Sequence, residues 1–162
     1  MSAVPERLML LYSRLESCLN KHISAFCQNG FTGDHHNHCA HFVSHIRGFT
    51  FGYTCKVAGT GSGDAASLRV HEVFVRCGDA GIFSDRPDSV TDCLAFVTKS
   101  SAVNLSTRTM ANIPKKHIGI YNLGSVYHYS NANHFVIKQS PEDFSHHYAG
   151  TGFQVYYGTF PP

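Results

Sequence analysis

Six strand-like runs in the second half of the chain restrict its fold more than any other feature. Leu123 and Gly124 alone separate the runs at 117–122 and 125–129, a spacing typical of a tight β-hairpin. An antiparallel meander is therefore expected. The six runs span residues 93–98, 103–107, 117–122, 125–129, 134–138 and 153–159.

The first half of the chain shows helical rather than strand periodicity. Apolar residues at helical spacing predict an amphipathic helix from Pro5 to about Leu19. A second, shorter helix is expected from Cys39 to about Arg47, with Gly48 closing it. Helices that precede an antiparallel meander predict a single α+β domain over residues 1–162, with the N-terminal helices packed on the sheet.

Four further segments have weaker or mixed signals. Residues 68–77 fit a short helix or a strand, and residues 79–92 are expected to be irregular. The segment 141–148 reads as a helix with Ser140 as its N-cap. The glycine-rich run at 58–64 is expected to be a mobile loop, and it lacks the strand before it and the Lys-Ser/Thr ending of a phosphate-binding loop.

The charge and hydropathy of the chain exclude several classes of partner. A formal charge of +2 with scattered basic residues does not indicate a nucleic-acid partner. No apolar run reaches the length of about 18 residues that a membrane span needs. The first residues lack the features of a secretory signal, so we expect synthesis in the cytoplasm without a cleaved leader.

The six cysteines show no C-x-x-C spacing, so neither a zinc ribbon nor a thioredoxin-type redox motif is supported. Cys93 lies in an apolar run and is expected to be a small buried hydrophobe. Cys55 and Cys77 bracket one loop region and are the pair to test for a disulfide.

Cys39 is the candidate nucleophile. It follows a polar run and opens the second predicted helix, where unpaired amides and the helix dipole favour an anion. We therefore expect a lowered thiol pKa, and we expect the Cys39 amide to donate to a developing oxyanion.

Two histidines on the predicted hairpin are the candidate partners of this thiol. His117 begins one strand and would act as the base, and His128 in the next strand would orient His117. Asn131, Asn133 or His134 are alternatives for the orienting role, since an amide can also hold an imidazole.

A metal site is the competing interpretation of the same region. His41 and His45 stand one turn apart on the predicted helix, as in many zinc sites, and three further histidines precede them at 35, 36 and 38. Together with Cys39, two or three of these imidazoles would form a closed structural site.

These blocks resemble those of the NlpC-type cell-wall peptidases. The run His38-Cys39-Ala40-His41-Phe42-Val43 is similar to that family's Cys-Ser-Gly-Phe-Val helix. Asp92-Cys93-Leu94-Ala95-Phe96-Val97 is similar to its Gly-Asp-Leu-Val-Phe-Phe strand, and His117-Ile118-Gly119-Ile120-Tyr121 to its His-Val-Gly-Ile-Tyr strand. Val126-Tyr127-His128 then matches the strand that brings the third triad residue.

The resemblance, over about residues 34–138, implies a papain-like α+β fold and a cysteine peptidase or amidase that needs no cofactor. Its substrate would be an amide bond in a peptidoglycan stem peptide, and the catalytic roles fall on Cys39, His117 and His128. Without a leader, such an enzyme resembles toxins that a secretion apparatus delivers into a neighbour's periplasm, with an immunity protein as a further partner.

The helix also resembles the Asn-Cys-Glu-His-Phe-Val block of lecithin:retinol acyltransferase relatives, which are thiol acyltransferases and lipid hydrolases. Asn37, His41, Phe42 and Val43 match that block. In those proteins the histidine strand precedes the cysteine, and here it follows, so the chain order favours the peptidase.

Overall fold

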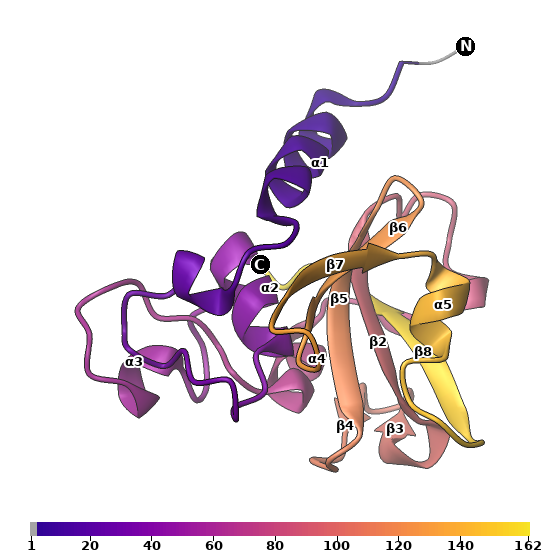
Figure 1. Cartoon of the computed structure of the whole chain (residues 1–162). Coiled ribbons are helices and arrows are strands. Elements are labelled where there is room, and N and C mark those ends of the chain that lie inside the picture. Colours follow the sequence, from indigo (N-terminus) through magenta and orange to yellow (C-terminus); the bar gives the residue numbers. More distant parts are fainter. Residues whose placement is uncertain (1–2) are drawn as a thin grey trace.

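The computed structural model describes residues 3–162 and shows helices packed around an antiparallel sheet (Figure 1). The sheet has six strands in the order β1-β8-β2-β5-β6-β7, and every neighbouring pair is antiparallel. The α+β class expected from the sequence is confirmed. In chain order the strands of this sheet are β1 (Ala80–Ile82), β2 (Cys93–Lys99), β5 (Lys116–Asn122), β6 (Ser125–Ser130), β7 (Phe135–Gln139) and β8 (Phe153–Gly158).

Two short strands, β3 (Val103–Asn104) and β4 (Thr109–Met110), form a separate ribbon. The helices are α1 (Glu6–Cys18), α2 (Cys39–Arg47), α3 (Cys55–Ala58), α4 (Val70–Arg76) and α5 (Pro141–Ser145). Single 3₁₀ turns occur at Ile23–Ala25, Phe83–Asp85 and Ser100–Ala102.

Local sequence signals set the ends of these elements. Leu123 and Gly124 have φ values of 47° and 89°, so the β5–β6 hairpin closes with two left-handed residues. Gly48 takes φ 74° and ends α2. The Ser140 hydroxyl accepts a hydrogen bond from the Asp143 amide, as expected of the α5 N-cap.

The sheet separates two apolar clusters. Helix α2 covers one face, where Phe42 and Val43 pack in the main core with Ile118 and Ile120 of β5. Helix α5 lies over the other face, where Phe144 packs with Val97, Val126 and their neighbours. Successive β5 residues therefore point alternately toward α2 and toward α5.

Residues 68–77, expected to be a short helix or a strand, contain helix α4. Other expectations for the loops need correction. The segment 79–92, expected to be irregular, contributes strand β1 at the sheet edge. The weak strand expected at 103–107 is only the two-residue β3. The run at 58–64 packs against another loop, because a Cβ on Gly59 or Gly61 would lie within 2.0 Å of the backbone of residues 28–29. Its glycines thus permit a close backbone approach.

The cysteines are all buried and unpaired. Cys93 is fully buried, as expected. Cys55 and Cys77 form no disulfide, because Cys77 belongs to the main core and Cys55 to a separate small cluster. Within residues 3–162, the helices are all too short or too polar to cross a membrane.

Candidate functional site

Cys39 is the first residue of α2, as the sequence indicated, and two asparagines fix the chain just before it. The Asn37 Oδ1 atom accepts a hydrogen bond from the Cys39 amide at 3.1 Å and another from Asn131 Nδ2 at 3.1 Å. Asn131 Oδ1 accepts from the His38 amide at 2.9 Å. The Cys39 amide, expected as the oxyanion donor, therefore already has a partner in this structure.

The Cys39 thiol is almost fully buried, with 1% of the residue exposed. Burial raises the pKa of Cys39 to about 11, although the amides of Ile118 and Ala40 and the charge of Lys116 oppose this shift. The expected lowered pKa is thus wrong, because desolvation outweighs the helix N-terminus. The thiol is neutral near pH 7 and needs a base before it can attack.

Three side chains on the opposite face of the sheet form a hydrogen-bonded chain. Nε2 of His117 lies 2.8 Å from Nδ1 of His128. Nε2 of His128 lies 2.7 Å from Oε1 of Gln139. His117 and His128 are both buried, so these contacts are shielded from water.

The donors and acceptors in this hydrogen-bonded series fix both histidine tautomers. An amide oxygen only accepts, so His128 donates its Nε2–H to Gln139 and its Nδ1 accepts from Nε2–H of His117. The remaining nitrogen, Nδ1 of His117, is then unprotonated. It is buried and has no hydrogen-bond partner among residues 3–162. Burial beside His128 and His147 lowers the pKa of His117 well below its usual value, which keeps this nitrogen a free acceptor.

His147 and Tyr148, which follow α5, complete the surroundings. The His147 ring stacks on His117, with 3.9 Å between centroids and 11° between planes. Tyr148 contacts His147 edge-on at 4.6 Å. The pKa of Tyr148 is raised, first by burial and to a smaller extent by the charge of a Cys39 thiolate. His147 was not identified from the sequence. The helix expected over 141–148 ends at Ser145, so His147 lies in the turns that follow α5.

The structure brings His117 and His128 into contact and places Cys39 beside the next residue, Ile118. The β5–β6 ladder runs only from Asn122↔Ser125 to Ile120↔Tyr127, so Ile118 lies beyond its end. The Ile118 amide faces the Cys39 sulfur. No hydrogen bond joins this sulfur to an imidazole within residues 3–162. The Cys39 thiol packs on the α2 face of the sheet, whereas His117 lies on the α5 face with Val97 and Phe144. Thiol and imidazole are therefore on opposite faces of β5 and do not contact each other.

The alternative orienting residues do not contact His117. Asn131 is engaged at the start of α2, and the hydrogen bond of Asn133 is one that its amide donates to Ser130 Oγ at 3.2 Å. His134 lies 3.7 Å from the exposed carboxylate of Asp34. The partner of His117 Nε2 is therefore His128.

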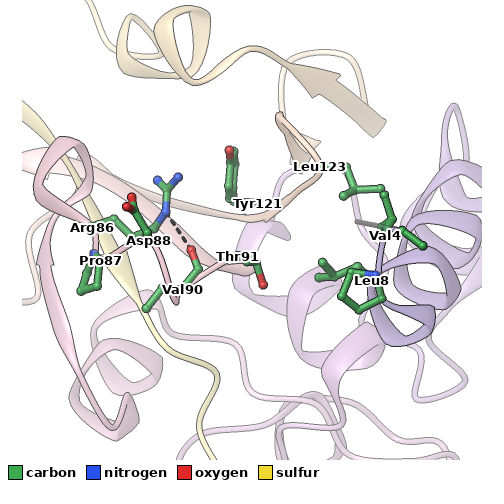
Figure 2. A pocket seen from close by; sticks show the side chains of 11 residues that line it. Val4, Leu8, Arg86, Pro87, Asp88, Val90, Thr91, Tyr121 and Leu123 are labelled. Carbon is green, nitrogen blue, oxygen red and sulfur yellow. Dashed lines mark hydrogen bonds between the residues drawn. The ribbon is translucent and has the colours of Figure 1, made fainter. Parts of the chain in front are cut away.

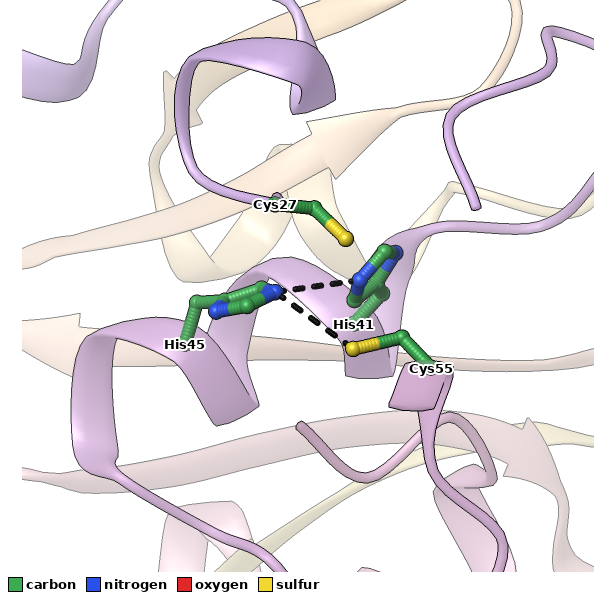
Figure 3. Close-up of side chains that lie close together, drawn as sticks. All are labelled: Cys27, His41, His45 and Cys55. Atoms are coloured by element: carbon green, nitrogen blue, oxygen red, sulfur yellow. Dashed lines mark hydrogen bonds between the residues drawn. The ribbon is translucent and has the colours of Figure 1, made fainter. Parts of the chain in front are cut away.

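A second cluster lies on the other side of α2 and contains Cys27, His41, His45 and Cys55 (Figure 3). Their four ligand atoms lie within 4.8 Å of one another. His41 and His45 are the helical pair singled out from the sequence, whereas Cys39, His35, His36 and His38 are not members. Cys27 lies in a loop and Cys55 at the start of α3, so these two residues form no short spacing motif in the sequence.

Two surface hollows differ in how close they lie to Cys39 and His117. The larger, of about 410 Å³, is lined by Val4, Arg86, Tyr121 and Leu123 among others (Figure 2). It lies toward the opposite end of β5 from His117 and contains no cysteine or histidine among its described residues. A smaller hollow of about 100 Å³ adjoins the start of α2 and is lined by Asn37, Leu68, Arg69, Val70, Pro114 and Lys116.

No protein-family model, curated protein or solved structure matches this chain. Its side chains alone therefore carry any inference about its function.

Proposed function

We propose that the protein is a cysteine amidase or endopeptidase with a papain-like, NlpC-type fold and the triad Cys39, His117 and His128. The observation that carries this proposal is the unprotonated, unpartnered Nδ1 of His117, buried next to the residue whose amide contacts the Cys39 thiol. The free lone pair lets His117 act as a general base, but burial raises the pKa of the thiol and lowers that of the imidazole. The proposal therefore requires substrate binding to change the surroundings of both groups before the proton moves.

The reaction proceeds in two halves. His117 Nδ1 takes the Cys39 proton as Sγ bonds to the amide carbonyl carbon, and then gives that proton to the amine nitrogen as the C–N bond breaks. The resulting thioester is hydrolysed by water, whose proton passes through His117 to the departing sulfur. His128 holds the imidazole in the required tautomer throughout.

The peptidoglycan stem peptide is the proposed substrate class. The blocks that resemble the cell-wall peptidases supply this assignment, and the small hollow beside Asn37 supports it. Arg69 and Lys116 line that hollow and place two cations where a peptide carboxylate would bind. Since Cys39 is buried and lies on the other face of the sheet from His117, substrate binding must open the layer around His147 and Tyr148 and also bring the thiol to Nδ1 of His117.

Digestion of defined muropeptides, followed by mass spectrometry, tests the activity. Wild-type protein should release fragments at one amide bond, and Cys39→Ala should lose at least about 10³-fold in kcat. Cys18→Ser is the matched control, since a serine can keep the hydrogen bond that Cys18 makes to the Arg14 carbonyl. An unchanged rate in Cys39→Ala would refute the nucleophile. Acyl transfer from phospholipid without muropeptide cleavage would instead favour the acyltransferase class.

Expression in a bacterium tests where the substrate lies. A copy directed to the periplasm should cause rounding or lysis, whereas the same chain kept in the cytoplasm should not. Cys39→Ala should abolish the effect, and Cys18→Ser should preserve it. Equal toxicity in both compartments would contradict a cell-wall target and with it a delivered toxin that requires an immunity protein.

A further inference from the structure

We propose that Cys27, His41, His45 and Cys55 bind one structural Zn²⁺ ion, at a site separate from the proposed catalytic triad. The side chains come from three segments: Cys27 from the loop after the first 3₁₀ turn, the two histidines from α2, and Cys55 from the start of α3. Figure 3 shows the two sulfurs and the two imidazoles directed toward a common point.

The separations suit a tetrahedral zinc ion. Bonds of about 2.0–2.3 Å from zinc to nitrogen and sulfur place tetrahedral ligand atoms about 3.3–3.8 Å apart. Here Nε2 of His45 lies 3.1 Å from Nε2 of His41 and 3.8 Å from Sγ of Cys55. Two thiols and two imidazoles are also the donor set that zinc prefers among the common divalent ions.

The hydrogen bonds behind His41 prepare its inward nitrogen to bind a metal. His38 Nε2 lies 2.8 Å from the Gly33 carbonyl, which only accepts, so His38 carries its proton there. His38 Nδ1 must then accept from His41 Nδ1 at 2.9 Å. This arrangement leaves His41 Nε2 unprotonated and directed into the cluster, as a metal-bound histidine requires.

The two sulfurs receive hydrogen bonds from one buried residue, Asn29. Its amide donates to Cys27 Sγ at 3.4 Å, and its side-chain Nδ2 donates to Cys55 Sγ at 3.3 Å. N–H groups directed at sulfur stabilise thiolates bound to a metal. A contact between His41 and His45 alone would explain neither these donors nor the convergence of two thiols on the imidazoles.

The surrounding loops need such a cross-link. The cluster beneath them contains only Cys27, Cys55 and Ala66 as buried apolar residues, with Phe31 and Leu68 partly buried beside it. An apolar core of this size stabilises little structure, and small modules often use a metal instead. Four protein ligands leave no open coordination position, so the ion would be structural rather than catalytic.

Elemental analysis of the full chain, purified with a histidine-free tag and without added metal, tests the site. We expect about one zinc ion per chain. After removal of the zinc, Co²⁺ should give the visible bands of a tetrahedral ion and a sulfur-to-cobalt charge-transfer band. A folded protein that holds no zinc and gives no such bands would overturn the proposal.

Variants assign the ligands. Cys27→Ser and Cys55→Ser should lose zinc, and Asn29→Ala should weaken its binding about 10- to 100-fold. Cys18→Ser should keep the full content. Circular dichroism identifies variants that fail to fold, and for these the cobalt spectrum of the wild type decides. Full zinc content in both folded cysteine variants would contradict the proposal.

The two proposals fail independently. Cys39→Ala should retain zinc and lose amidase activity, because Cys39 is not a member of the cluster. Inactive wild-type protein with one bound zinc would refute only the amidase. Active wild-type protein without zinc would refute only the metal site.

Discussion

Nε2 of His117 lies 2.8 Å from Nδ1 of His128, and this contact orients the whole proposed catalytic layer. The side-chain oxygen of Gln139 on strand β7 accepts a hydrogen bond from Nε2–H of His128. This bond sets the direction of the hydrogen bond between the two histidines. Gln139, which contacts His128 and not His117, thereby determines which nitrogen of His117 is unprotonated.

Gln139 is consequently a positioning residue with a specific kinetic signature. Gln139→Leu should lower kcat about tenfold or more with little change in KM, because His128 loses the acceptor that fixes its tautomer. Gln139→Glu should move the acid limb of the kcat/KM profile upward by about one pH unit, because the carboxylate favours a protonated imidazole. A pH profile unchanged in Gln139→Glu would show that Gln139 does not act through His128.

Acid should destabilise the protein through its buried imidazoles. Burial, together with the neighbouring His147, lowers the pKa of His128 to about 4, although the hydrogen bond to Gln139 opposes the shift. Below about pH 6.5 the unfolded chain binds protons that the native His128 does not, so the free energy of unfolding falls with pH and levels off only below about pH 4. The loss from this residue is on the order of 3 kcal/mol.

Urea unfolding between pH 4 and 7 measures this effect. His128→Gln should show a smaller loss than the wild type, because it keeps a polar side chain and removes the titrating group. Acid would release a bound metal from both proteins alike, so the difference between them excludes the loss of stability that metal release causes. Equal slopes in the two proteins would contradict the assignment.

Gly119 of β5 allows β6, the strand that carries His128, to approach closely. A Cβ there would lie 2.6 Å from Val126 Cγ1 and 2.8 Å from the Tyr127 carbonyl oxygen. Gly119→Ala should therefore push β5 and β6 apart and cost about 1–3 kcal/mol of stability. Gly124→Ala is the comparison on the same hairpin. A Cβ at Gly124 would meet no neighbouring atom, but the residue has a positive φ, so the substitution should only strain the turn. The amidase activity of this variant should survive. Full activity in folded Gly119→Ala would show that strand spacing does not control the site.

Local patterns made much of the fold predictable from the sequence. Helix α2 and the β5–β6 hairpin each have their signals within about a dozen residues: apolar spacing with Gly48 at one end, and alternating strands around Leu123-Gly124. The contact between His117 and His128 followed from that hairpin. Strand β1 was missed because its three residues gain their partners only from β8, more than 70 residues later.

Tertiary burial decided what the sequence could not show. The helix N-terminus suggested a lowered pKa for Cys39, yet the core around it reverses the shift. Likewise, the pairing of His41 and His45 was visible as a helical spacing, whereas Cys27 and Cys55 join them only because two loops pack through Asn29. A metal site built from separate loops has no spacing motif to detect.

Asn37 and Asn131 provide the last prediction, since they hold the start of α2 through one shared oxygen. Asn37 Oδ1 accepts from both the Cys39 amide and Asn131 Nδ2, so either substitution disturbs the same hydrogen bonds before the first turn of α2. Asn37→Ala should lower the free energy of unfolding by roughly 1 kcal/mol, the usual net contribution of a hydrogen bond. Asn131→Ala should cost a similar amount, and the double variant should cost less than the two together, because the interactions are coupled. Asn133→Ala, a nearby exposed substitution, should stay within about 0.5 kcal/mol of wild type. Urea unfolding in zinc-saturated buffer measures the free energy of unfolding of the wild type and of all four variants. Strictly additive losses in the double variant would show that the two asparagines act separately.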